Sequence, residues 1–198
     1  VRYGMPGADG AIEKVRIVDG RFHISTIGDV PPEGICGSGL VDLLAELRRA
    51  GWMTNRGTFA DKARDIHVEP ERPITLSRAD VGHLSIAKAA TAVGQRVLLR
   101  RLGLEPADLD RVYLAGGFAN AIDTQSAFDI GLLVPVPAER VVRVGNASIG
   151  GARTLLLARR RRTELEALVR RIEHVELESE PDFFDLFTDG CLFEPIAI

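Results

Sequence analysis

Cysteine is scarce in this 198-residue chain, which has only Cys36 and Cys191, far apart in the sequence. Neither belongs to a CxxC pair, so their spacing supports neither zinc, nor an iron–sulfur cluster, nor a disulfide framework. The four histidines have no i, i+3 or i, i+4 partner among themselves, which argues against a histidine metal site. We therefore expect no metal bound by the cysteines and histidines of this chain.

The chain also lacks an excess of charge of one sign and a long apolar run. Its formal net charge of −3 at pH 7 provides no general attraction to nucleic acid or to an anionic membrane. No apolar run reaches the roughly 18 residues of a membrane span, and no signal peptide is indicated. We expect a cytoplasmic protein, with neither nucleic acid nor membrane as a partner, whose 45% hydrophobic residues can bury a core.

Strand-like and helix-like segments alternate along the chain. Two β-branched runs flank Asp19-Gly20, a dipeptide typical of a type I′ turn, and predict a hairpin over 12–27. Leucines at helical spacing then predict a helix from Leu40 that ends near Gly51. The N-terminal quarter is therefore a hairpin followed by a helix.

A second helix is predicted from a capping box at Ser77 and Asp80 to Gly103, with Ile86, Ala90, Val93 and Val97 on one face. The later elements are predicted as a strand over 110–115, a helix over 124–131 that Gly131 stops, a strand over 140–144, a helix from about 148 that continues over 164–172, and a strand over 174–177. This alternation implies an α/β fold with helices packed on a sheet.

The C-terminal part carries two further signals. Arg159 to Arg162 form a basic block, which we interpret as a solvated helix end because cations suit a helix C-terminus. Residues 181–198 form an apolar tail with Phe183, Phe184, Phe187 and Phe193. We expect a lobe over 1–180 and a tail over 181–198 that folds back on the lobe or on a partner domain.

Glycines stand where helices are predicted to begin at three places: GICGSG (34–39), LAGGFAN (114–120) and VGNASIGG (144–151). Glycine lets the backbone approach a ligand closely, and free amides at a helix start favour anions. The commoner nucleotide signatures do not fit. GICGSG has the wrong order for a dinucleotide fingerprint, and Gly151-Ala152 stands where a P-loop needs Lys-Ser/Thr.

The three glycine turns differ in what they favour. For GICGSG, phosphate contact and a tight structural turn both remain open. For Gly116-Gly117, ligand contact is favoured, because the preceding strand places the turn at the carboxyl edge of the sheet, where open α/β folds bind ligands. For Gly145-Asn146, a helix cap is an equally good explanation.

The ordered combination of motifs resembles one family. Its segments here are GAIEKVRI (10–17), GICGSGLVDLLAEL (34–47), VYLAGGFAN (112–120), IGLLVP (130–135) and VGNASIGGA (144–152), and the match continues to PDFFDLF (181–187). The chain resembles the C-terminal ATPase region of the reductive activators of corrinoid-dependent enzymes, in the acetate and sugar kinase, heat-shock chaperone and actin (ASKHA) superfamily. The resemblance implies an α/β, RNase H-like (actin-like ATPase) lobe, a mixed sheet with helices on its faces.

The resemblance also implies a function. Such proteins couple ATP, with Mg, to reduction of a corrinoid from Co(II) to Co(I) on a partner corrinoid protein of a methyltransferase system, and a homodimer is compatible with this. Electrons come from an N-terminal [2Fe-2S] ferredoxin-like domain, which we expect upstream of Val1 together with the first ATPase lobe. The isolated fragment is then expected to be inactive, and no catalytic residue is assigned.

The resemblance assigns cofactor-binding positions to two of the glycine turns. The superfamily's adenosine motif, a Gly-Gly turn after a strand, maps onto Gly116, Gly117, Phe118 and Asn120. The glycine loop before the first helix maps onto Gly34, Gly37, Ser38 and Gly39. Cys36 is a loop residue there, not a cluster ligand.

Two other functions stay open. A sugar or acyl kinase-like phosphotransferase of the same superfamily would transfer phosphate to a small molecule and would need an acid in the missing half. A non-catalytic interaction or dimerisation lobe would dock a partner on its phenylalanine-rich tail. An upstream cysteine-rich domain would separate the activator from the kinase.

Overall fold

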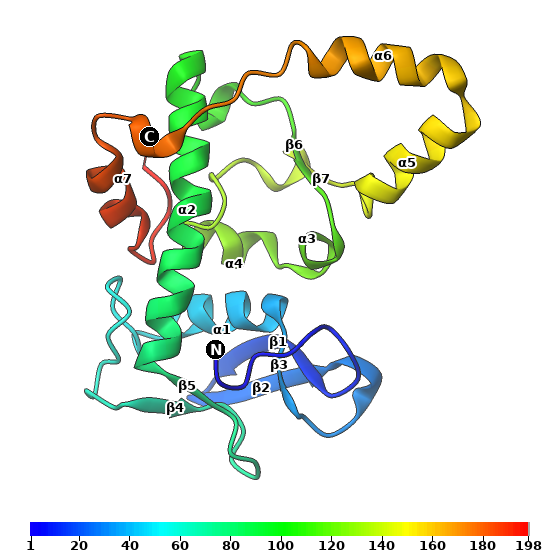
Figure 1. The fold of residues 1–198 in the computed structure, drawn as a ribbon. Helices are drawn as coiled ribbons and strands as arrows, with labels where there is room; N and C mark the ends of the chain where they lie inside the picture. The colour runs from blue at the N-terminus through cyan, green and yellow to red at the C-terminus, as the bar shows by residue number, and fades with distance from the viewer. Residues whose placement is uncertain (198) are drawn as a thin grey trace.

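The computed structural model describes residues 1–197. Figure 1 shows a body built around the long helix α2, with an arm formed by α5 and α6. The strands form three separate sheets with the orders β2-β1-β3, β4-β5 and β6-β7. The α/β class expected from the sequence is therefore realised with small sheets and helices packed against them.

The predicted hairpin is confirmed as β1 (Ala11–Val18) and β2 (Arg21–Thr26), paired antiparallel. Asp19 and Gly20 have φ of 50° and 71°, the pair of positive values that a type I′ turn requires. The short strand β3 (Gly34–Ile35) pairs with the other edge of β1, in parallel.

Helix α1 (Gly37–Arg49) confirms the predicted first helix and completes the open edge of β1. Strand β3 pairs only with the first two residues of β1, so the amides of Val15 and Ile17 have no strand partner. Asp42 and Glu46, one turn apart on α1, accept them instead, with N–O distances of 3.3 Å to Val15 and 2.7 Å to Ile17. Helix carboxylates thus take the place of a neighbouring strand.

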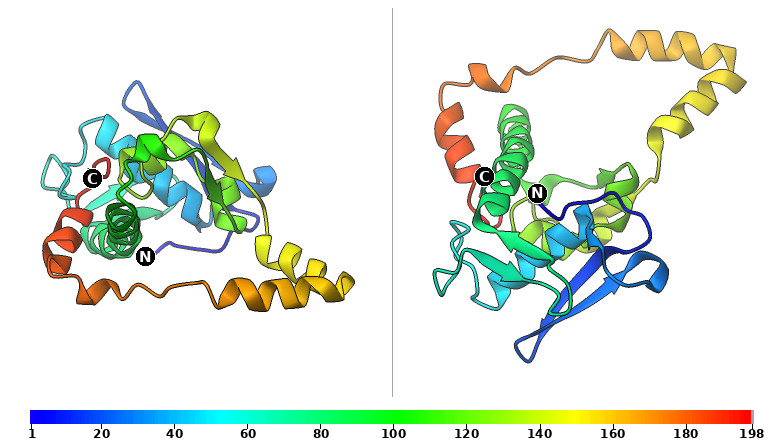
Figure 2. Two further views of the ribbon diagram at one scale, coloured as in Figure 1. Left: turned by 90° about the horizontal axis from the view of Figure 1, so that it is seen from above. Right: turned by 60° about the horizontal axis from the view of Figure 1, so that its bottom comes forward.

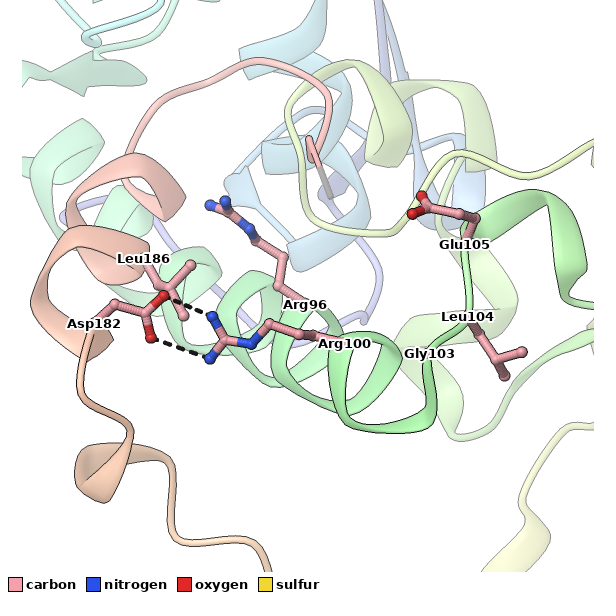
Figure 3. A pocket seen from close by; sticks show the side chains of 7 residues that line it. All are labelled: Arg96, Arg100, Gly103, Leu104, Glu105, Asp182 and Leu186. Carbon is pink, nitrogen blue, oxygen red and sulfur yellow. Dashed lines mark hydrogen bonds and ion pairs between the residues drawn. The ribbon is translucent and has the colours of Figure 1, made fainter.

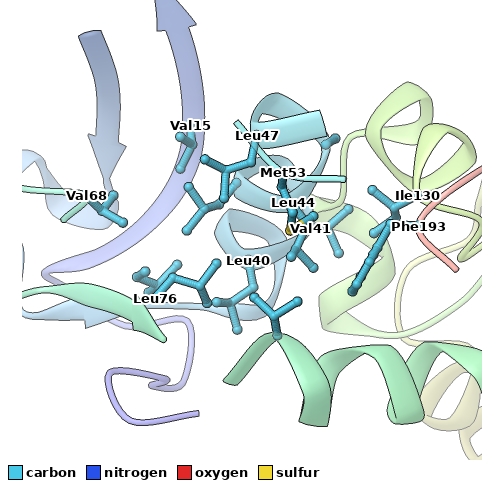
Figure 4. Close-up of a cluster of buried hydrophobic side chains, with 14 of the residues drawn as sticks. Val15, Leu40, Val41, Leu44, Leu47, Met53, Val68, Leu76, Ile130 and Phe193 are labelled. Carbon is cyan, nitrogen blue, oxygen red and sulfur yellow. The ribbon is translucent and has the colours of Figure 1, made fainter. Parts of the chain in front are cut away.

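The main hydrophobic core lies between α1, the first sheet and the C-terminal segment, as Figure 4 shows. Its fully buried side chains include Ile12, Val15, Ile35, Leu43, Leu47, Met53, Phe59, Leu76 and Phe193. Phe193 is far from the others in sequence. The core is therefore closed by a segment that lies more than a hundred residues after α1.

Strands β4 (Asp65–His67) and β5 (Thr75–Ser77) lead into α2 (Arg78–Leu102). The predicted capping box is confirmed, because Ser77 Oγ accepts the Asp80 amide at 3.1 Å and Asp80 Oδ2 accepts the Ser77 amide at 3.1 Å. Burial alone would raise the pKa of Asp80, but hydrogen bonds from Ser77 and the Arg2 amide bring that pKa below its ordinary value. Gly103, with φ of 63°, ends the helix as predicted.

The predicted face of α2 is partly wrong. Val93 and Val97 are fully buried, but Ile86 is 56% exposed and Ala90 is also exposed, whereas Lys88 is buried. The C-terminal segment packs along the side of α2 that carries Lys88, and it turns that side into the buried one.

Two parallel strands carry the next helices. Strand β6 (Val112–Leu114) is followed by α3 (Gly117–Ala121) and α4 (Thr124–Asp129), and β7 (Val141–Arg143) is followed by α5 (Ala147–Leu157). Gly131, with φ of 70°, follows α4 where the sequence predicts the stop.

Helices α5 and α6 (Arg159–Val169) form the arm, which extends away from the body in both views of Figure 2. Neither helix has a buried residue. The arginine block begins α6 and does not end a helix, because the chain bends at Ala158, and Arg160 and Arg161 pair with Glu164. The strand predicted over 174–177 is wrong: these residues form no ladder and run into a short 3-10 turn (Leu177–Ser179).

Helix α7 (Phe183–Gly190) returns to the body and packs on α2. Phe183 and Phe187 contact the apolar side of α2, and Phe193 enters the main core, whereas Phe184 is 83% exposed. Arg100 pairs with Asp182 at the rim of a cavity of about 430 Å³ between α2 and α7 (Figure 3). Three of the four phenylalanines therefore pack on the body.

Residues 190–194, which begin at the last residue of α7 and which we call the strap, are hydrogen-bonded to both α1 and α2. Lys88 Nζ donates to the Gly190 carbonyl at 2.6 Å, and Ser85 Oγ donates to the Cys191 carbonyl at 2.8 Å. From α1, Arg48 Nε donates to the Phe193 carbonyl at 2.9 Å.

Within residues 1–197, no helix combines the length and apolarity needed to cross a bilayer.

Replacement of Glu46 tests the helix-capped edge. Glu46→Ala leaves the Ile17 amide without its acceptor, so we expect the free energy of unfolding to fall by about 1–3 kcal/mol. Glu46→Gln keeps an acceptor oxygen and should recover part of the loss. Urea unfolding measures both variants, with Glu13→Ala on β1 as the control. If Glu46→Ala and Glu13→Ala lower the free energy of unfolding equally, Glu46 does not stabilise the edge of β1.

Candidate functional site

The three glycine turns lie together at the carboxyl ends of β6 and β7. Because these strands are parallel, the turns that follow them meet at one edge, where the Gly116 amide donates to the Gly145 carbonyl at 2.8 Å. The ring of Phe118 lies against Gly37, since a Cβ built at Gly37 would come within 2.8 Å of it. The structure thus brings the start of α1 to the turns after β6 and β7.

The Gly116-Gly117 turn is open on its outer side. Gly116 has φ of 100°, a conformation that side-chain-bearing residues rarely adopt. A Cβ built at Gly116 or Gly117 would meet no atom within 4 Å. The first amides of α3 have no acceptor inside the helix, and Phe118 is 50% exposed beside Asn120, which is also exposed. Bare backbone is therefore accessible here.

The GICGSG loop divides into two kinds of position. A Cβ at Gly34 would lie 2.7 Å from the Tyr3 carbonyl oxygen, and one at Gly39 would collide with the Ile12 carbonyl. Ser38 is buried, with its Oγ 3.2 Å from Cys36 Sγ. Gly34, Ser38 and Gly39 therefore shape the turn and seat α1 on β1, and only Gly37 faces the Gly116 turn.

The third turn carries a capped helix. Asn146 Oδ1 accepts the Ile149 amide at 3.0 Å, which fits the helix-cap interpretation. Gly150 and Gly151 have open space around them, and a Cβ at Gly145 would lie 3.9 Å from Asn120 Nδ2. This turn therefore borders the Gly116 turn through Asn120.

An apolar cavity of about 180 Å³ lies beside Phe118, between α1 and α2. Its lining residues are Gly37, Leu40, Val41, Leu44, Leu84, Ala87, Lys88, Phe118, Ile130 and Leu132. Gly37 and Phe118 connect it to the glycine turns. A hollow therefore adjoins the turn to which the adenosine motif maps.

Sequence reasoning missed Lys88, which lines this cavity and a second one of about 180 Å³ under the strap. Lys88 is 5% exposed, and its Nζ lies 5.7 Å from the centre of the Phe193 ring. Burial lowers the pKa of Lys88 to about 8, although Cys191 and Glu194 act in the opposite direction. The only sequence signal was a lysine inside an otherwise apolar and small-residue stretch.

Comparison with known proteins identifies the family. Residues 1–196 match the family described as the C-terminal domain of RACo, the ASKHA domain. This chain belongs to that family. The ASKHA domain is 33% identical over 214 residues to the corrinoid activation enzyme RamQ of Eubacterium limosum, an alignment that covers 96% of this chain and 36% of RamQ.

A solved structure supports the same assignment. The ASKHA domain superposes on a reductive activator for corrinoid, iron-sulfur protein with a TM-score of 0.86 and 34% identity, covering 98% of this chain and 34% of the other. The resemblance to reductive activators and the fold class are thereby confirmed. The chain spans about a third of the length of these relatives.

The buried amine of Lys88 predicts a specific pH dependence. Its pKa of about 8 in the folded state lies below the ordinary 10.5, so the unfolded chain binds more protons between these values. The free-energy cost of burying the charged amine of Lys88 in the folded state is fully present below pH 8 and disappears above pH 10.5. The wild-type free energy of unfolding, relative to Lys88→Met, should therefore rise by up to about 3 kcal/mol across this window.

Urea unfolding at a series of pH values measures this difference. Lys14→Met, at an exposed lysine of β1, is the control and should show no such rise. Parallel pH profiles for the wild type and Lys88→Met would show that the Lys88 pKa is not lowered.

Proposed function

We propose that this ASKHA domain is the C-terminal nucleotide-binding part of an ATP-dependent reductive activator. The full-length protein would reduce the corrinoid of a partner corrinoid protein in a methyltransferase system from Co(II) to Co(I). Support comes from the family and from the names of two relatives, a corrinoid activation enzyme and a reductive activator for corrinoid, iron-sulfur protein.

The observation that carries the nucleotide proposal is the open Gly116-Gly117 turn beside an apolar cavity. Phe118 offers an aromatic face to a purine, and Asn120 offers an amide at the rim. The free amides at the start of α3, with Gly37 opposite, suit an anionic ligand. Gly34, Ser38 and Gly39 act in this proposal by holding the Gly37 turn in place.

ATP would arrive with Mg, whose ligands in such sites are largely phosphate oxygens and water. The described residues include no cluster of three or more His, Cys, Asp or Glu side chains suited to a metal ion. We therefore propose that the carboxylates for Mg and for phosphate chemistry come from the other lobe of the full-length protein, and that the isolated domain is inactive.

A [2Fe-2S] cluster does not fit this chain. Such a cluster takes four protein ligands, and the chain has two cysteines. Cys36 is buried against the Ile12 carbonyl, and Cys191 lies in the strap. We therefore assign the electron-supplying cluster to a separate domain of the full-length protein. ATP-driven movement of two lobes would supply the energy for reducing the cobalt centre.

The arm favours a homodimer as part of this function. Ile149, Leu156 and Leu157 of α5 are 65%, 76% and 76% exposed, and Leu168 and Val169 of α6 are also exposed. An apolar surface of this kind on two short helices marks an interaction site. The arm is rich in arginine while the whole chain has a net charge of −3, so the body of a second copy offers the complementary charge.

Nucleotide binding is tested by filling the open turn. Gly117→Val in the full-length protein places a side chain in open space, so we expect the affinity for a non-hydrolysable ATP analogue to fall at least tenfold with an unchanged melting temperature. Gly82→Val, at another open glycine, is the control. Isothermal titration calorimetry measures the affinity; equal affinities of the two variants would overturn the site.

The dimer is tested by placing charge on the arm. The full-length protein is expected to show twice its monomer mass in light scattering, and Leu156→Asp should shift it to the monomer because a carboxylate would be buried in the interface. Ile86→Asp, at an exposed position of α2, serves as the control. A monomeric wild type at tens of micromolar would refute the dimer.

A further inference from the structure

A further surface cavity, of about 420 Å³, lies on the hairpin side of the body, between β2, the segment after α1 and β4. Its lining residues are Phe22, Trp52, Ala60, Asp61, Ala63, Asp65, Ile66 and His67. None of them lines the cavity beside Phe118. The proposed nucleotide site therefore does not account for it, and the two sites can be tested separately.

The apolar part of this cavity is aromatic. Phe22 and Trp52 meet edge to face, with ring centroids 5.5 Å apart and planes at 90°. Both rings are partly exposed, so they form a surface that a ligand can contact. The faces of such rings attract cations, and tryptophan does so most strongly.

The rim of the cavity is acidic. Asp61 and Asp65 line it together with Ala63, as alternate residues of one segment, whereas Lys62 and Arg64 between them do not. The ion pairs among residues 1–197 include neither Asp61 nor Asp65. One oxygen of Asp61 accepts the Ala63 amide at 2.9 Å, a bond that uses one oxygen of the carboxylate and leaves the other available to a donor. Two aromatic residues and two carboxylate residues outside these ion pairs thus line the same cavity.

We propose that this cavity binds an arginine side chain presented by a partner polypeptide. A guanidinium is flat, stacks on aromatic faces, and donates in a fork to carboxylates, which matches the aromatic residues and the acidic rim. The cavity exceeds the size of a guanidinium alone, so it accommodates the methylene stem as well. Asp61, Asp65 and His67 are exposed, so the rim is open to a side chain that approaches from outside.

Trp52 makes the test direct, because it is the single tryptophan of these 198 residues and it lines this cavity, so the fluorescence change that a Trp52→Phe variant abolishes reports on this cavity. The probes are the capped peptide acetyl-Gly-Arg-Gly-amide and the same peptide with citrulline, which keeps the shape and lacks the charge. For one side chain we expect saturable binding of the arginine peptide with a dissociation constant of about 1 mM. The citrulline peptide should bind at least tenfold more weakly.

Matched variants of the full-length protein assign the contact. The double variant Asp61→Asn, Asp65→Asn should weaken binding of the arginine peptide at least tenfold, whereas Asp185→Asn, at an exposed carboxylate of α7, should not. Circular dichroism melting checks that each variant is folded. Equal binding of the two peptides, or an unaffected double variant, would overturn the proposal.

A choline titration separates a polypeptide arginine from a free organic cation. If choline binds as tightly as the arginine peptide, the cavity is a general organic-cation site and the assignment to arginine is wrong. ATP-analogue binding, measured on the same variants, should be unchanged because the two cavities share no residue. A loss of arginine binding with intact nucleotide binding supports this site without bearing on the proposed function.

Discussion

The seating of α1 on β1 is the contact on which the rest of the structure depends. Gly39 allows the helix to touch the Ile12 carbonyl, and Asp42 and Glu46 hold the free amides of Val15 and Ile17. A larger residue at 39 would lift the helix off the strand. The same contact fixes where α1 begins, and therefore where Gly37 meets Phe118.

The position of the candidate site follows from this contact between α1 and β1. Two parallel strands, β6 and β7, deliver their turns to one edge, and α1 brings a third turn to them. Each turn is built differently. The Gly116-Gly117 turn is open backbone, the GICGSG turn is packed except at Gly37, and the turn after β7 is capped by Asn146. The glycines that resemble one another in the sequence thus have separate tasks.

Local signals in the sequence predicted local structure well. The type I′ turn at Asp19-Gly20, the capping box at Ser77 and the helix stop at Gly103 each depend on a few neighbouring residues, and each is confirmed. The buried face of α2 was partly mistaken, because the strap that covers Lys88 lies about a hundred residues away. The cavity beside Phe118 combines four segments, and no single window of sequence contains it.

The strap has a consequence for how the protein is made. Phe193 completes the main core beside Gly57 and Lys88, and Arg48 and Lys88 donate hydrogen bonds to the strap carbonyls. During synthesis the ribosome releases α1 and its sheet long before it adds these residues. Until then the nascent domain has an unfilled core, so chaperones would meet it as a partly open chain, and its last folding step waits for the strap to emerge.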